Sequence, residues 1–186
     1  ANPDMLLAKA WDNRIGCALA AETVRQLRGK RHPNTVFAVA TVQEEVGLRG
    51  AQTSAFKIQP DVAFALDVGI AHDSPGTEGD EKLGGGPLIV VYDASAIPSR
   101  GLLDLVVDTA KKLRIPLQFE AVERGGTDAG RIHLNGQGVP TLSMGIPARY
   151  IHSHVSIISR KDFELAVKLL VAVVKRLDRK TVDGLV

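Results

Sequence analysis

The stretch TVFAVATV at residues 35–42, followed at once by QEE at residues 43–45, decides the fold class. Its first eight residues are β-branched or apolar with almost no polar alternation. That pattern is typical of a strand covered on both faces. Shorter apolar runs of the same kind recur along the chain, at residues 62–66, 87–92, 117–122 and 139–144. We therefore expect a sheet whose strands are largely buried.

Segments with apolar residues at helical spacing lie between these runs. They predict helices at residues 13–27, 48–56, 99–114, 127–134 and 159–177, and Ser99 is a candidate N-cap. Strands that take turns with helices are typical of an α/β protein with a parallel or mixed sheet. The predicted architecture is a three-layer αβα sandwich with a mostly parallel mixed sheet. We expect residues 1–186 to form a single domain.

Composition excludes several classes of function. The 186 residues carry 23 basic and 21 acidic side chains, a net charge of +2, and only 4% are aromatic. This balance gives no electrostatic reason to expect nucleic acid or an anionic membrane as a partner. Cys17 is the only cysteine, so no disulfide forms within the chain, and a reducing compartment such as the cytoplasm is expected.

Several acidic residues follow the predicted strands directly. In open α/β sheets, ligands bind beyond the carboxyl ends of the strands, and the residues expected at that edge are Asp12, Glu44, Glu45, Asp67, Asp128 and His152. Clustered carboxylates repel one another unless a cation lies between them. Oxygen and imidazole ligands together suit zinc, cobalt or manganese. Taken singly, Asp12 could instead cap the following helix, and Glu44 and Glu45 could be surface acids of a loop.

Five segments in this order resemble a known family. They are AWDNRIG at 10–16, QEEVGLRG at 43–50, ALDV at 65–68, GGTDA at 125–129 and RYIHS at 149–153. They are similar to the dinuclear-metal aminopeptidases that assemble as tetrahedral dodecamers. This zinc-peptidase-like family includes glutamyl and deblocking aminopeptidases, and some members have been labelled endoglucanases. The resemblance runs over essentially the whole chain.

The resemblance implies a role for each matching residue. Asp12 matches the carboxylate that bridges both metal ions, and Glu44 matches the general base that activates the water between them. Glu45 and His152 match ligands of one ion, and Asp67 matches a ligand of the other. The resemblance thus implies two divalent ions, with zinc or cobalt favoured.

The resemblance also implies substrates and an assembly. Peptides would be the substrates, and the segment around Gly126, Thr127 and Asp128 would lie near the pocket that receives them. The full-length family forms homo-oligomers. The expected activity is release of N-terminal residues from peptides.

One feature of the family has no counterpart in this chain. A further histidine ligand comes from an early strand, and an inserted β-rich domain separates it from the segment that matches Asp12. We therefore expect residues 1–186 to be the C-terminal catalytic part, lacking the N-terminal segment and the inserted β domain. We expect such a chain to be weakly active or inactive alone.

Two other functions remain open at this point. A non-catalytic fragment would keep the fold without the activity. A glycosidase would need two carboxyl groups about 5–9.5 Å apart that face one another across a sugar. Glu44 and Glu45 are sequence neighbours and make a poor pair of this kind, and aromatic residues that would stack on sugars are scarce.

Overall fold

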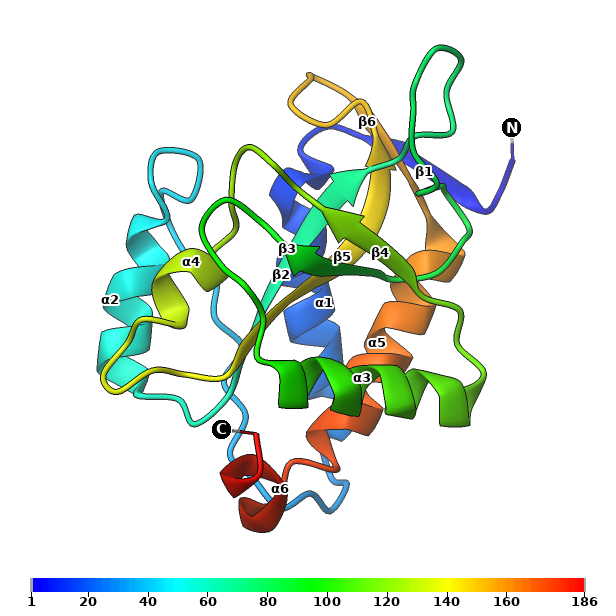
Figure 1. The fold of residues 1–186 in the computed structure, drawn as a ribbon. Helices are drawn as coiled ribbons and strands as arrows, with labels where there is room; N and C mark the ends of the chain where they lie inside the picture. The colour runs from blue at the N-terminus through cyan, green and yellow to red at the C-terminus, as the bar shows by residue number, and fades with distance from the viewer. Residues whose placement is uncertain (1, 186) are drawn as a thin grey trace.

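A mixed sheet with helices on both faces forms the body of the molecule, seen in a computed structural model that describes residues 2–185 (Figure 1). Its elements are β1 (Met5–Ala8), α1 (Trp11–Leu27), α2 (Arg49–Ile58), β2 (Ala63–Ile70), β3 (Leu88–Tyr92), α3 (Arg100–Leu113), β4 (Gln118–Ala121), α4 (Ala129–Ile132), β5 (Thr141–Arg149), β6 (Ser156–Ser159), α5 (Arg160–Val174) and α6 (Arg179–Asp183). The predicted α/β class is confirmed.

Strand β5 organises the sheet. The strand order is β1-β6-β5-β3-β4, and β2 pairs with β5 along its whole length. The pairs β2–β5 and β3–β4 are parallel, whereas β5 pairs antiparallel with both β3 and β6. Strands β1 and β6 were not predicted. Each has only four residues and they pair with each other, so their formation depends on tertiary contacts more than on local pattern.

Alternate residues of β5 face the two helix layers. Leu142, Met144, Ile146 and Ala148 lie in the hydrophobic core together with residues of α1, α3 and α5. Thr141 and Ser143 point the other way, toward Ala129 and His133 beside α4. Helix α4 contacts β2 and β5, and α2 packs against α4 (Figure 1). The three-layer arrangement predicted from the sequence follows from this alternation.

The predicted strand over residues 35–42 does not form. These residues adopt no regular secondary structure, and Phe37 and Val42 are 62% and 67% exposed. A strand needs a neighbour to receive its backbone hydrogen bonds. Among residues 2–185 no strand pairs with this segment, and β2, the nearest candidate, pairs only with β5. The prediction of a buried strand at residues 35–42 is therefore wrong, because the segment has no partner strand among the described residues.

A cavity of about 700 Å³ lies between this segment and β2. Residues 35–39 and 41 line one side, and residues 62–66 line the other. Asp12, Glu44 and Asp128 also line it. The unpaired segment therefore leads directly to the edge where the acidic residues gather.

No helix among residues 2–185 is both long enough and apolar enough to cross a membrane.

Candidate metal centre

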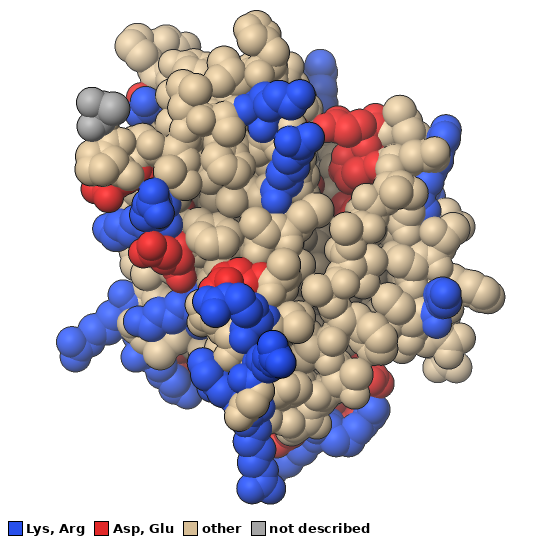
Figure 2. All heavy atoms as spheres, turned by 180° about the vertical axis from the view of Figure 1, so that it is seen from behind, with Lys and Arg blue, Asp and Glu red and all other residues tan. Residues whose placement is uncertain are grey.

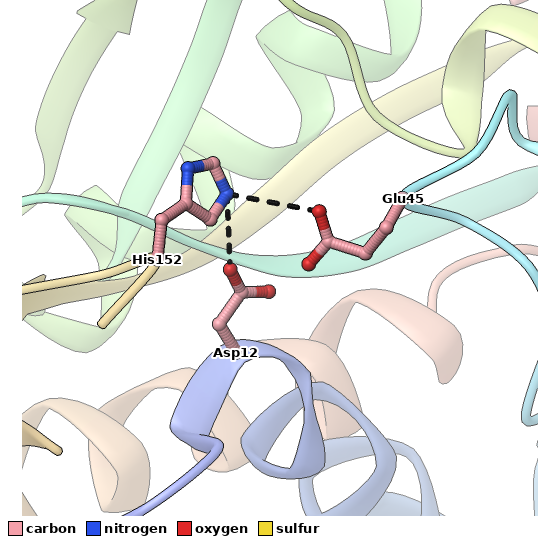
Figure 3. A group of neighbouring side chains, drawn as sticks. All are labelled: Asp12, Glu45 and His152. Carbon is pink, nitrogen blue, oxygen red and sulfur yellow. Dashed lines mark ion pairs between the residues drawn. The ribbon is translucent and has the colours of Figure 1, made fainter. Parts of the chain in front are cut away.

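Three of the side chains predicted to bind metal converge at one end of the sheet. His152 Nε2 lies 3.3 Å from Asp12 Oδ2 and 3.8 Å from Glu45 Oε2 (Figure 3). One ligand atom from each of the three residues lies within 4.8 Å of the other two. The residues come from α1, the loop before α2 and the loop after β5, so the group exists only in the folded chain.

Residues next to Asp12 fix its place at the start of α1. The side-chain amide of Asn13 donates a 2.7 Å hydrogen bond to the carbonyl of Leu66, and its oxygen accepts one from the amide of Gly16. A Cβ on Gly16 would lie only 2.2 Å from the Leu66 carbonyl oxygen. Helix α1 can therefore approach β2 this closely only with glycine at position 16.

Glu44 and Glu45 lie on a tight turn before α2. The amides of Gly47 and Leu48 both donate to the Glu44 carbonyl, at 3.0 and 2.9 Å. The Gly50 amide donates to the carbonyl of Val42, and any Cβ on Gly50 would meet the Val42 backbone within 2.5 Å. The turn thus closes on the first residues of α2, and the glycines of the QEEVGLRG segment make that closure possible.

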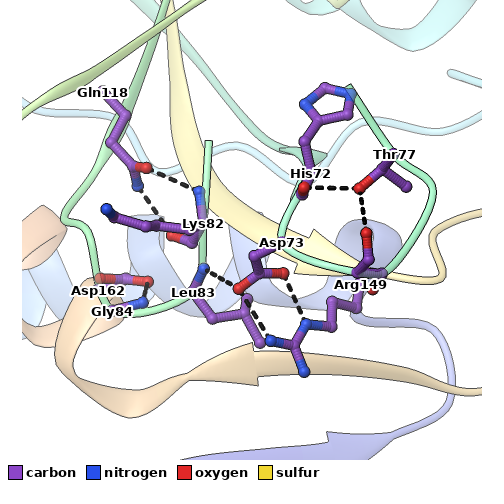
Figure 4. Close-up of polar contacts among 10 residues, drawn as sticks. His72, Asp73, Thr77, Lys82, Leu83, Gly84, Gln118, Arg149 and Asp162 are labelled. Carbon is purple, nitrogen blue, oxygen red and sulfur yellow. Dashed lines mark hydrogen bonds and ion pairs between the residues drawn. The ribbon is translucent and has the colours of Figure 1, made fainter. Parts of the chain in front are cut away.

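His152 lies on the loop that follows β5, and an ion pair anchors the beginning of this loop. The Arg149 guanidinium makes two hydrogen bonds to the Asp73 carboxylate, at 2.6 and 2.9 Å (Figure 4). This pair is only partly exposed, and the arginine lowers the pKa of Asp73 below its usual range. Asp73 also accepts from the amide of Leu83, so the pair joins β5 to the long loop before β3.

Buried Asp162 holds the far end of the same long loop. Its carboxylate accepts a 2.7 Å hydrogen bond from the amide of Gly84 (Figure 4) and one of 2.8 Å from the amide of Gly86. Burial raises the pKa of Asp162. These contacts stabilise the loop that supports Arg149.

The carboxylates in this region raise one another's pKa. Burial is the main cause of the rise in the pKa of Glu44 to about 7, and the charges of Asp128, Glu45 and Asp12 add to it. The pKa of Asp67 is raised to about 8, again mainly by burial. The pKa of Asp12 is also raised by burial and by the charge of Glu45, although the charge of His152 opposes this rise. Several negative charges are thus held together without enough positive charge nearby.

Asp67 lies close to the group without joining it. Its carboxylate accepts a 2.9 Å hydrogen bond from the following amide, of Val68. The charges of Glu44 and Asp12 contribute to its raised pKa, which places it near them. It is not one of the three residues whose ligand atoms lie within 4.8 Å of one another.

The segment Gly126, Thr127 and Asp128 lies beside the acidic group. Asp128 lines the cavity with Glu44, and burial raises its pKa. The hydroxyl of Thr127 contacts that of Ser143 in β5 and donates to Asp93 at 3.3 Å. The predicted pocket segment is therefore next to the candidate metal ligands.

The donor set of this group fits a divalent transition metal. Two carboxylate oxygens and one imidazole nitrogen are ligands that zinc and cobalt accept. The neighbouring carboxylates add to the rise in the pKa of Glu44, Asp67 and Asp12, although burial is its main cause, and a cation would offset this charge repulsion. In the space-filling view, acidic side chains gather beside a hollow on this face of the molecule (Figure 2).

Sequence reasoning missed the residues that hold the ligands in place. Asn13 and Thr41 bond to residues far along the chain, Leu66 and Asp128, and no local pattern indicates either contact. The glycines at positions 16 and 50 were a usable signal, because glycine inside or at the start of a helix is costly unless close packing requires it.

Comparisons with known proteins show what the chain is similar to. The chain is 40% identical to glutamyl aminopeptidase of Lactococcus lactis subsp. cremoris over 182 residues, 98% of this chain and 51% of the relative. Its structure superposes with a TM-score of 0.97 on a TET aminopeptidase from a marine sediment archaeon, at 49% identity, over 100% of this chain and 53% of that one. The TET1 peptidase of Pyrococcus horikoshii gives a TM-score of 0.83 at 37% identity, over 95% and 52% of the two chains. The chain spans about half the length of the relatives it matches.

The fold and the acidic group define a class of α/β peptidase domains. Residues 1–169 match the family described as M42 glutamyl aminopeptidase. The chain belongs to this family.

Proposed function

We propose that this chain carries most of the metal-dependent active site of an aminopeptidase, which removes N-terminal residues from peptides. The observation that supports this most directly is the convergence of Asp12, Glu45 and His152 beside Glu44. Glutamyl aminopeptidase of L. lactis, a relative by sequence, supports the choice of reaction.

The proposed roles divide the acidic residues between binding and catalysis. Asp12 would be shared by two divalent ions, Glu45 and His152 would hold one of them, and Asp67 would hold the other. Zinc or cobalt suits these ligands. When bound, such ions polarise the scissile carbonyl and lower the pKa of a water molecule.

Glu44 is the proposed general base. Its pKa of about 7 without metal is close to the value at which one group can both accept and release a proton near neutral pH. Glu44 takes the proton of the attacking water and passes it to the leaving amine. Asp128 lines the cavity beside Glu44, and it is proposed to face the peptide together with its neighbours Gly126 and Thr127.

Assembly and location are also proposals. The TET1 peptidase of P. horikoshii can assemble into a tetrahedron or an octahedral shell. We propose that the polypeptide containing this segment forms a homo-oligomer such as a dodecamer, and that it works in the cytoplasm, where the single thiol of Cys17 stays reduced.

The role of Glu44 can be tested in a chimaera. This chain would replace the matched 182-residue segment of the L. lactis enzyme, and hydrolysis of glutamyl and leucyl p-nitroanilides would be measured with added cobalt. Glu44→Gln should lower kcat by at least about 100-fold, the usual contribution of a general base, while the bound metal remains. The control Glu78→Gln, in an exposed loop, should leave kcat unchanged. Full activity of the Glu44→Gln chimaera would contradict the assignment.

A non-catalytic fragment is the competing account. It predicts that the chain binds no zinc or cobalt at micromolar concentration, whereas the proposed site requires binding. Calorimetric titration of the chain with zinc or cobalt distinguishes these two accounts.

A further inference from the structure

The segment before Glu44 is attached to the rest of the protein at a single polar point. Residues 35–41 make no backbone–backbone hydrogen bond within the described chain. Their only hydrogen bond there is from the hydroxyl of Thr41 to the carboxylate of Asp128, at 2.6 Å. An acceptor that carries charge makes this bond stronger than a neutral one.

This attachment lies just before the functional residues. Glu44 and Glu45 follow Thr41 by three and four positions. On the other side of the turn, the Gly50 amide bonds to the Val42 carbonyl at 2.9 Å and ties the turn to α2. The Arg49 amide also bonds to the Gln43 carbonyl, so several bonds hold the turn to α2, and Thr41–Asp128 is the hydrogen bond that joins it to a different element.

Asp128 is itself firmly held. It precedes α4, which contacts β2 and β5. Its neighbour Thr127 contacts the hydroxyl of Ser143 and donates to buried Asp93. Asp93 in turn accepts three hydrogen bonds of 2.7 Å from its own turn, so the support reaches from β3 and β5 to Asp128.

Packing adds to the polar contact. A Cβ placed on Gly130 in α4 would lie 3.2 Å from Leu48 Cδ1, which shows how closely α4 approaches the end of the turn. Asp128 Oδ1 is buried with no hydrogen-bond partner, so its other oxygen, Oδ2, makes the only hydrogen bond of this carboxylate, the one from Thr41. A carboxylate with one oxygen buried and unpaired is costly, and among the described residues the bond to Thr41 is the only hydrogen bond that this carboxylate makes.

We propose that Asp128 is a positioning residue, which holds the Glu44–Glu45 turn through Thr41 so that Glu45 reaches Asp12 and His152. This inference deepens the proposed metal site and rests on it. In this role Asp128 acts on the site through Thr41.

Cobalt binding by the chain tests the proposal. Thr41→Val keeps the shape of the side chain and removes the hydroxyl, whereas Thr41→Ser keeps the hydroxyl. Supporting residues around a metal site typically change its affinity by about 10–100-fold. Thr41→Val should therefore weaken Co²⁺ binding about 10-fold or more, and Thr41→Ser should retain most of the affinity. The control Thr53→Val removes a hydroxyl that bonds within α2 and should bind Co²⁺ as the unaltered chain does.

Amide hydrogen exchange in metal-free protein gives a second, independent measurement. Thr41→Val and Asp128→Asn should both speed exchange at the amides of Gly47 and Leu48, while exchange in β5 remains slow, which also shows that each variant is folded. Unchanged exchange at these amides in Thr41→Val would overturn the proposal, even if cobalt binds. Absence of cobalt binding by the unaltered chain would instead contradict the metal site, and the exchange result would still decide whether the tether exists.

Discussion

Strand β5 and residues 35–42 have similar apolar sequences and opposite structures. Five of the nine residues of β5 are hydrophobic or glycine by type, all but its last residue are buried, and it pairs with β2, β3 and β6. Residues 35–42 are at least as apolar, with six hydrophobic residues in eight, yet several are exposed and none pairs with a strand among the described residues. The difference shows that apolar β-branched sequence permits a strand, whereas neighbouring backbone decides whether one forms.

Proline substitutions should give the largest difference in stability loss between the two regions. Leu142→Pro removes a backbone donor and a fully buried side chain in β5, so we expect a loss of at least about 3 kcal/mol of stability and little folded protein. Val39→Pro removes a donor that has no partner and should change stability by less than about 0.5 kcal/mol. Urea unfolding followed by circular dichroism measures both. Equal losses in the two variants would mean that residues 35–42 are paired in solution.

Truncation of side chains should give the next largest contrast. Leu142→Ala leaves a cavity in the core and should cost about 2–5 kcal/mol. Phe37→Ala removes a side chain that is 62% exposed and should cost less than about 0.5 kcal/mol. A cost above about 2 kcal/mol for Phe37→Ala would show that this ring is buried in solution.

Glu44 and Asp67 should make the chain less stable as pH rises. This is the opposite of the pH dependence that carboxylates in surface salt bridges give. The pKa values of Glu44 and Asp67 are about 7 and 8 in the folded chain, above their unfolded values. The folded state therefore binds more protons between about pH 4 and 8, and stability falls as pH rises through this range. We expect metal-free chain to be at least about 1 kcal/mol more stable at pH 5 than at pH 8.

Thermal unfolding at the two pH values, with and without zinc, measures this effect. Zinc binds the ionised carboxylates, so it should stabilise the chain more at pH 8 than at pH 5. Greater stability of metal-free chain at pH 8 would show that the carboxylates are not raised in pKa as described.

The sequence was sufficient to predict the elements that satisfy their own local rules. Ser99 was expected as an N-cap and accepts from the amide of Leu102, and β2 and β5 were expected from their apolar runs. Strand β6 was not expected, because Ser156 and Ser159 interrupt a very short apolar pair. Its formation depends on pairing with β5 and with β1, and β1 lies far away in the sequence.

The candidate site shows the same contrast between what the sequence indicates and what only the fold shows. The residue types at Asp12, Glu45 and His152 were visible in the sequence, and their order along the chain indicated that they belong together. The bond between Thr41 and Asp128 joins positions 87 residues apart, so it appears only once the chain is folded. The side chains that converge here were therefore easier to predict than the contacts that hold their loops.

Anomalous diffraction from zinc-soaked crystals tests the central claim most directly. We expect a zinc peak about 2.0–2.2 Å from one oxygen of Asp12, one oxygen of Glu45 and Nε2 of His152. In crystals of His152→Ala the peak should weaken or disappear. Zinc bound only elsewhere, or no peak between these three side chains, would contradict the assignment of this group as a metal centre.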